Sequence, residues 1–347
     1  MKIFTPAIFV ASILLLECSL TITAHAVDLN ESLQLHGYGH VGALNTDANN
    51  YFKADNGTTW DYKDLALLFT GKLNERSNAW IELFTVDGKN RVDWAFVDYQ
   101  VASGPLLRLG QIKMPIGLYN EIRDVEFIRP SSLQPFLYQE SVEITNEAYQ
   151  GVGLAYDHEF GRGSLTWDLY AGKSAEYEAG DHHHENLLGA RVSYQTPVEG
   201  LRAMISTFKE KLTHIATNQS DDKHSYIVSL DYSPGDLDLK TEYGQSTAFG
   251  KTIETWYAQA AYSFNEHWKP YLRYDYITTD VDNKGDPSFY QYSTVAGLGY
   301  TINANFGLRM ETHFNHGYAM PVVAEQMDAG TGAINWKLSA ISLNFNF

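Results

Sequence analysis

The last segment of the chain alternates between apolar and polar side chains up to its final residue. One parity carries Ile341, Leu343, Phe345 and Phe347, and the other carries Ser342, Asn344 and Asn346. A strand with this period of two has one face suited to an apolar medium and one suited to water. Soluble domains usually end in a frayed polar tail instead. The pattern therefore favours a sheet whose two faces meet different surroundings.

The same period recurs along the chain in sixteen segments, most of roughly nine to thirteen residues, which is the length that a tilted strand needs to cross a membrane. We expect strands near Leu33–Asn45, Asp64–Leu73, Ala79–Thr85, Val92–Val101, Leu106–Met114, Tyr149–Glu159, Ser164–Gly172, Leu187–Gln195, Leu201–Lys209, Ser225–Ser233, Leu237–Ser246, Glu254–Phe264, Lys269–Thr278, Tyr292–Ile302, Phe306–Asn315 and Trp336–Phe347.

The connections between these segments fall into two classes. Every second connection is tight and rich in turn formers, such as Gly161–Gly163, whereas most of the others are longer and polar. This asymmetry is typical of membrane barrels, and a soluble sandwich gives no reason for it. Backbone groups inside a membrane must pair, so the sheet must close. The sequence predicts an all-β fold, a transmembrane antiparallel β-barrel of about 16 strands.

The first 26 residues have the pattern of a secretory signal peptide. Lys2 precedes an apolar run from Ala7 to Leu16, and Ala24-His25-Ala26 fits a small-x-small cleavage site. We expect residues 1–26 to be the signal peptide and residues 27–347 to form the barrel domain. Cys18 is the only cysteine and would leave with the signal, so we expect no disulfide.

Composition limits the partners of the chain. A net charge of −17 argues against nucleic acid as a partner. The chain carries 23 Tyr, 17 Phe and 7 Trp, which a membrane barrel would place in girdles at the two interfaces. We therefore expect membrane lipid to surround the barrel.

Charged residues keep to one parity of the expected strands. In Phe306–Asn315, for example, Arg309 and Glu311 oppose Met310 and its apolar neighbours. Charge on one face predicts a lipid-facing wall and a wet interior. We expect the interior to be lined by Arg108, Arg191, Arg202, Lys240, Arg273 and Arg309, with Asp98, Asp157, Asp168, Asp231, Glu242, Asp275 and Glu311 of opposite sign.

These charges have two interpretations. Opposed charges across a lumen set a field that orients polar solutes. Alternatively, neighbours such as Lys240/Glu242 and Arg273/Asp275 only neutralise each other. If the acidic excess reaches the lumen, it predicts a mild preference for cations.

The connection from Pro115 to Ala148, after the fifth strand, is the longest. It carries Glu121, Arg123, Asp124, Glu126 and Arg129, and Lys113 comes just before it. A loop of about thirty residues with mixed charge and several aromatic residues is expected to be bound to the rest of the protein. It either folds into the barrel or forms an external flap.

The segment Leu109-Gly110-Gln111-Ile112-Lys113-Met114-Pro115-Ile116-Gly117 resembles the "GQFKxPFG"-type signature of the phosphate-selective porin O/P family and its relatives, with Ile112 and Ile116 in place of phenylalanines. The resemblance implies an outer-membrane porin, a homotrimer that lets small hydrophilic solutes or ions diffuse through a water-filled pore. It also implies that the loop after the fifth strand folds inward, so that its charged residues and Lys113 line the constriction. Phosphate selectivity in that family rests on a ladder of basic residues, whereas this chain has 25 Lys and Arg against 42 Asp and Glu.

A histidine run, His182-His183-His184, lies in an expected outer loop between Asp181 and Glu185. Imidazole and carboxylate groups bind zinc, copper or nickel. Three successive residues of an extended segment alternate in direction, so the run is only a weak candidate for a metal site. We expect no cofactor.

Other functions remain open at this level. A barrel-based enzyme of the phospholipase or protease type would need a Ser/His/acid or paired-carboxylate set, and no G-x-S-x-G motif occurs. We expect no enzymatic activity. A surface receptor or adhesin role for the loops could accompany a pore. A gated active transporter would need a long N-terminal plug before the first strand.

Overall fold

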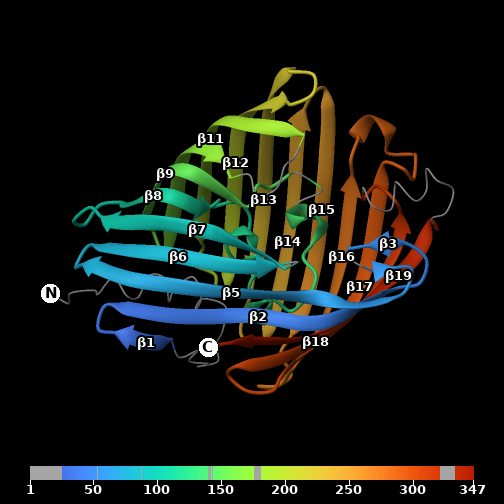
Figure 1. The fold of residues 1–347 in the computed structure, drawn as a ribbon, viewed down its shortest axis with the longest axis horizontal. Helices are drawn as coiled ribbons and strands as arrows, with labels where there is room; N and C mark the ends of the chain where they lie inside the picture. Colours follow the sequence, from blue (N-terminus) through green and yellow to red (C-terminus); the bar gives the residue numbers. More distant parts are fainter. Residues whose placement is uncertain are drawn as a thin grey trace.

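The computed structural model describes residues 26–52, 54–86, 88–139, 142, 144–175, 181–320 and 333–347. The expected signal peptide lies outside these residues, except for Ala26. Sixteen antiparallel strands, β2 and β5 to β19, form one closed sheet (Figure 1), which confirms the predicted barrel. In the part of the chain that is described, no helix is long and apolar enough to span a membrane.

The barrel strands are β2 Leu33–Thr46, β5 Thr58–Asn74, β6 Ser77–Val86, β7 Lys89–Gln100, β8 Leu106–Lys113, β9 Ala148–Phe160, β10 Gly163–Ser174, β11 His182–Gln195, β12 Leu201–His214, β13 Ser220–Tyr232, β14 Leu237–Ala248, β15 Lys251–Tyr262, β16 Trp268–Thr278, β17 Tyr290–Thr301, β18 Phe306–Gly317 and β19 Asn335–Asn346. Shorter elements are β1 Val27–Asn30, β3 Asn50–Tyr51, β4 Ala54–Asp55 and the 3-10 turns η1 Asn120–Ile122, η2 Glu126–Ile128, η3 Phe136–Tyr138 and η5 Val281–Asn283.

The barrel closes where the last strand pairs with the first. β19 and β2 are antiparallel, with Leu343 opposite Val41. Phe347 exchanges two backbone hydrogen bonds with Gly37, of 2.9 and 3.0 Å. β1, which the sequence did not predict, pairs with β2 immediately beyond this point, with Val27 opposite Leu35. It continues the ladder along β2 past the last residue of β19.

The two faces of the wall differ as the alternation predicted. In β18, Phe306, Met310 and Phe314 are exposed on the outside, whereas Arg309 and Glu311 are buried on the inside. β14 and β16 show the same separation. The apolar exterior and the polar interior are therefore fixed by the strand period.

Aromatic side chains form rows on the outer face of β13 to β18. Near the side with the longer connections, Trp256 lies 5.3 Å from Tyr274, and Tyr274 lies 6.0 Å from Tyr292, between ring centroids. Near the short turns, Trp268 lies 4.4 Å from Tyr300. Two such rows mark the boundaries of the apolar belt of a membrane barrel. The side with the short turns is then periplasmic, and the side with the longer connections is extracellular.

Several strands extend further than the sequence indicated: β5 begins at Thr58, β11 at His182 and β13 at Ser220, and β12 ends at His214. His182–His184, expected in an outer loop, belong to β11, and their partners are Leu212 to His214 of β12. The expectation was wrong because the ladder continues above the apolar belt, where both faces are polar and the alternation disappears. A register shift between Glu185 and Leu188 separates the two parts of β11.

Candidate functional site

The described residues of the segment between β8 and β9 (114–139, 142 and 144–147) lie inside the barrel. Ile116, Leu137 and Ile144 of this segment are fully buried and share one hydrophobic cluster with Phe208 and Tyr257 of the wall. The main apolar core of this protein therefore lies within the lumen. The prediction that the loop after the fifth barrel strand folds inward is confirmed, and the external flap is wrong.

A buried carboxylate of β14 holds the start of this segment. Glu242 accepts hydrogen bonds from the Leu118 backbone N–H at 2.8 Å and from the Tyr257 hydroxyl at 2.7 Å. The Tyr138 hydroxyl also donates to Glu242, and the Ser229 hydroxyl does so at 2.5 Å. Charge-assisted bonds of this kind are roughly twice as strong as neutral ones. Glu242 therefore joins two parts of the inserted segment, near Leu118 and at Tyr138, to the wall.

The middle of the segment is bound by β16 and β18. Glu311 accepts from the backbone N–H groups of Ser132 (2.8 Å) and Leu133 (2.9 Å). The Arg273 guanidinium donates to the Leu133 carbonyl at 3.0 Å. Arg309 donates to the Phe127 carbonyl at 2.8 Å and to that of Arg129 at 3.1 Å. Charged wall residues here provide hydrogen-bond partners for the backbone of the inserted segment. Buried peptide groups require such partners.

Acidic side chains of the segment bind the wall in return. Glu126 of η2 accepts from the Ser342 hydroxyl and from Asn344 of β19, and the His40 ring lies 3.3 Å away. Glu121 of η1 pairs with Arg191, whose Nε donates to Asp168 at 2.8 Å. These contacts attach the segment to opposite sides of the barrel.

A cluster of ion pairs lies where the segment leaves β8. The Lys113 ammonium contacts Asp124 at 2.5 Å and also contacts Asp93 and Glu147. Arg91 bridges Asp93 (3.0 Å) and Glu147 (3.1 Å). The three carboxylates around these cations are buried or nearly so, which increases the strength of their attraction. The cluster holds both ends of the segment together.

Glu82 of β6 completes this cluster and was not anticipated. It is fully buried, and one of its oxygens accepts from the Tyr38 hydroxyl at 2.7 Å. Glu82, Asp93 and Asp124 are the one group of three acidic or imidazole ligands that converges within 4.8 Å among the described residues. The Lys113 ammonium contacts two of these three carboxylates. The polar parity of Glu82 in its strand was the signal that could have identified it, whereas Asp93 lies at a register shift that hides its direction.

The remaining predicted wall residues face the lumen in different surroundings. Asp157 is exposed, and the Arg108 guanidinium lies over the Phe96 ring at 5.9 Å. Arg202 pairs with Asp231 at 2.8 Å. These residues lie near the periplasmic end, outside the network around the inserted segment. Those of the segment itself, Arg123, Glu126 and Arg129, are buried.

The two suggested neutral pairs have different outcomes. Arg273 does pair with Asp275, at 2.7 Å. Lys240 instead contacts Asp238 at 2.5 Å and Asp231 at 3.6 Å, while Glu242 serves the inserted segment. Pairing within one strand therefore does not describe the interior as a whole.

The histidine run alternates in direction, as its extended backbone requires. The His184 ring lies 3.0 Å from Glu210 on the inner face, and the His182 ring lies 5.2 Å from that of His214. His183 has the opposite parity from both. Among the described residues, the three imidazoles do not converge on one point.

Comparisons with known proteins agree on the fold. No protein-family model matches the chain, and no curated protein matches its sequence. Among solved structures, the anion-selective porin from Comamonas acidovorans is 13% identical over 91% of this chain and 99% of that chain, with a TM-score of 0.67. Salmonella typhi OmpF in complex with daunomycin is 13% identical over 93% and 100%, with a TM-score of 0.63.

Vibrio cholerae OmpT is 11% identical over 93% of this chain and 100% of that chain, with a TM-score of 0.62. Identities this low show a common fold and nothing finer. The shared fold is that of outer-membrane barrels, and the apolar belt with its aromatic rows has the corresponding surface. The barrel lies in the bacterial outer membrane.

Proposed function

We propose that the protein is a porin through which small hydrophilic solutes and ions diffuse passively across the outer membrane. The observation that carries the proposal is the inserted segment, which is bound to opposite walls of a sixteen-strand barrel through Glu126, Arg191, Glu242 and Glu311. A barrel of this size has room for an aqueous channel, and a loop fixed inside narrows it. The porins among the solved structures support this reading.

The test is conductance in planar bilayers. We expect the purified protein to produce discrete steps of current, and a complete lack of steps would contradict the proposal. Replacing Ser131–Gln139 by a short Gly-Ser linker should increase the step size, since it removes the middle of the inserted segment. Shortening the outer loop Asp282–Ser288 is the matched control and should leave the step size unchanged.

We further propose that the channel prefers cations and is not specific for phosphate. Acidic residues exceed basic ones by 42 to 25, and exposed Asp157 and Glu159 have the inner parity near the periplasmic end. A reversal potential under a salt gradient measures this preference. Strong selectivity for anions would contradict it.

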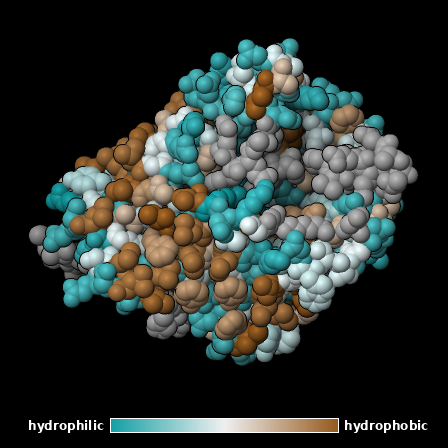
Figure 2. Space-filling model, in the orientation of Figure 1, coloured by the Kyte–Doolittle hydropathy of each residue, from teal (hydrophilic) through white to brown (hydrophobic). Residues whose placement is uncertain are grey.

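We propose that three copies of the barrel associate through the outer face of β2 and β5 to β8. Figure 2 shows a broad hydrophobic surface over these strands. Its exposed side chains include Val41, Leu65, Ile81, Leu83 and Leu109. On this face aliphatic residues predominate, whereas the outer face of β13 to β18 carries rows of aromatic rings. A face without those rows is suited to contact with another protein more than with the membrane interface.

A further inference from the structure

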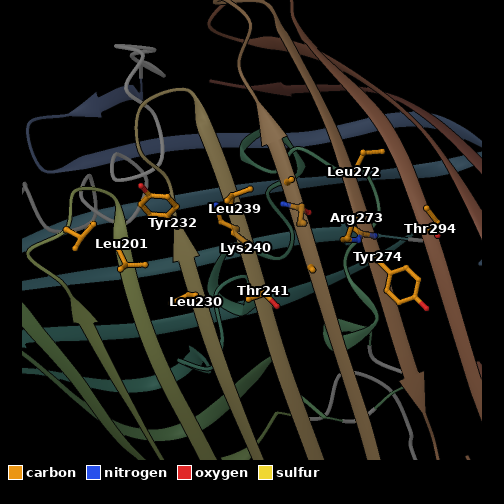
Figure 3. A pocket seen from close by; sticks show the side chains of 14 residues that line it. Leu201, Leu230, Tyr232, Leu239, Lys240, Thr241, Leu272, Arg273, Tyr274 and Thr294 are labelled. Carbon is orange, nitrogen blue, oxygen red and sulfur yellow. The ribbon is translucent and has the colours of Figure 1, made fainter.

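The outer face of β13 to β17 contains a depression of about 740 Å³. Figure 3 shows the side chains that surround it, with the inserted segment lying behind the wall strands. Its floor is formed by the small residues Thr241, Ala258, Ala260 and Thr294. Bulkier side chains, among them Leu239, Leu272 and Tyr274, stand beside the floor.

The depression follows from the sequence of one strand. On the outer face of β15, Trp256, Ala258, Ala260 and Tyr262 succeed one another. Two alanines thus lie between two large rings whose Cα atoms are about 20 Å apart, at roughly 3.3 Å per residue, and the wall is low between the rings. Ala258 lies opposite Thr241 and Tyr274, so the adjacent strands extend the floor on one side and raise a wall on the other. An elongated apolar groove of this kind fits a hydrocarbon chain.

The location of the groove identifies its occupant as a lipid. It lies on the aromatic-rich sector that faces the membrane and not on the smooth face assigned to protein contact. It also reaches the periplasmic rim, because Val198 in the turn between β11 and β12 contributes to its lining. Lipids that enter from this side belong to the periplasmic leaflet.

The two periplasmic turns beside the groove carry only negative charge. Glu199 and Asp236 are the charged residues of the turns 196–200 and 233–236, and both are exposed. The two turns are neighbours, since the Ser233 N–H donates to the Gly200 carbonyl at 2.8 Å. Carboxylates near a lipid headgroup attract an ammonium group and repel an anionic headgroup.

We propose that this groove is a binding site for phosphatidylethanolamine, with an acyl chain over Ala258 and Ala260 and the headgroup ammonium near Glu199 and Asp236. The groove provides the affinity because it buries apolar surface of the chain. The two carboxylates provide the choice of headgroup.

Native mass spectrometry of the mature barrel, with palmitoyl-oleoyl phosphatidylethanolamine or phosphatidylglycerol added in detergent, tests the proposal. We expect the wild type to retain phosphatidylethanolamine several-fold more than phosphatidylglycerol. Ala258→Leu fills the groove and should reduce retention at least fivefold. Ala171→Leu, on the outer face of β10 and away from the groove, is the matched control and should behave as the wild type.

The charge variant Glu199→Lys/Asp236→Lys changes only turn residues and should shift the preference to phosphatidylglycerol. If Ala258→Leu does not fold, this charge variant still tests the proposal through the headgroup preference. Equal retention by Ala258→Leu and Ala171→Leu would overturn the site. Headgroup preference that survives the charge reversal, or retention of lipid A in place of phospholipid, would overturn the assigned occupant.

Discussion

Single buried residues determine how firmly the inserted segment is held. Glu311 uses both carboxylate oxygens, one for the N–H of Ser132 and one for that of Leu133. In Glu311→Gln one of these oxygens becomes an NH2 group, so one buried N–H loses its acceptor. An unsatisfied buried donor costs about 1–3 kcal/mol.

We therefore expect Glu311→Gln to lower the free energy of unfolding in urea by about 1–3 kcal/mol. We also expect it to increase the brief fluctuations of the single-channel current. Glu159→Gln changes an exposed carboxylate in the same way and should affect neither measurement. Equal stability of the two variants would show that Glu311 does not anchor the segment.

Glu147 gives a prediction for pH. Burial raises the pKa of its carboxyl, but Lys113, Arg123 and Arg91 nearby outweigh burial and hold the pKa well below the ordinary value of 4.5. A carboxyl with a depressed pKa contributes stability that is fully present above its unfolded-state pKa and is lost only as pH falls through the lower folded-state value.

The contacts of Glu147 should consequently remain intact between pH 7 and pH 5. Limited proteolysis of the inserted segment measures this, and we expect equal protection at both values and weaker protection in stronger acid. Loss of protection already at pH 5 would contradict the assigned ion pairs. In Glu147→Gln, the decrease of protection in stronger acid should be smaller.

At the scale of elements, the final strand depends on a glycine of the first. A Cβ added to Gly37 would lie 2.2 Å from the Phe347 ring, so the ring must move in any substituted variant. At Gly71 of β5 the nearest atom is 3.8 Å away, which is an ordinary contact. Overpacking of this kind costs about 1–3 kcal/mol.

We expect Gly37→Val to reduce the fraction of heat-resistant folded barrel on gels, because the closing pair of strands is weakened. Gly71→Val is the matched control on the neighbouring strand and should assemble normally. An equal reduction of the heat-resistant fraction in both variants would show that the effect comes from losing a glycine and not from the contact with Phe347.

At the scale of the whole molecule, the proposed assembly divides the outer surface into a lipid-facing sector and a smooth aliphatic sector in contact with other copies. A fluorophore attached to a single cysteine reports which sector meets lipid. Nitroxide-labelled lipids should quench a probe at Leu169→Cys on β10 and should quench one at Val41→Cys on β2 much less. Equal quenching at both positions would contradict association through β2 and β5 to β8. Cys18 belongs to the expected signal peptide, so the mature chain offers no competing thiol.

The sequence by itself determined the wall of this barrel. Each strand must present one side to lipid and one to water, and this produces the period of two in the sequence. That period was enough to assign Arg309 and Glu311 to the inner face and Met310 to the outer face. Closure followed from the need to pair every backbone group in the membrane. The inward course of the long connection was also predictable, from its length, its mixed charge and a resemblance.

Only the tertiary structure decided the contacts inside. Glu242 and Glu311 were predicted to face a lumen, but their partners are backbone N–H groups far away in the chain. The strand period predicts the face of a residue and not such distant partners. Glu82 and Asp93 lie in the Lys113 cluster because a register shift and the inserted segment bring charged residues of three strands, β6, β7 and β8, together with those of the segment. The groove over Ala258 exists because Tyr274 and Leu239 stand beside it. Periodicity fixes which medium a side chain faces, whereas packing between distant segments fixes what it touches.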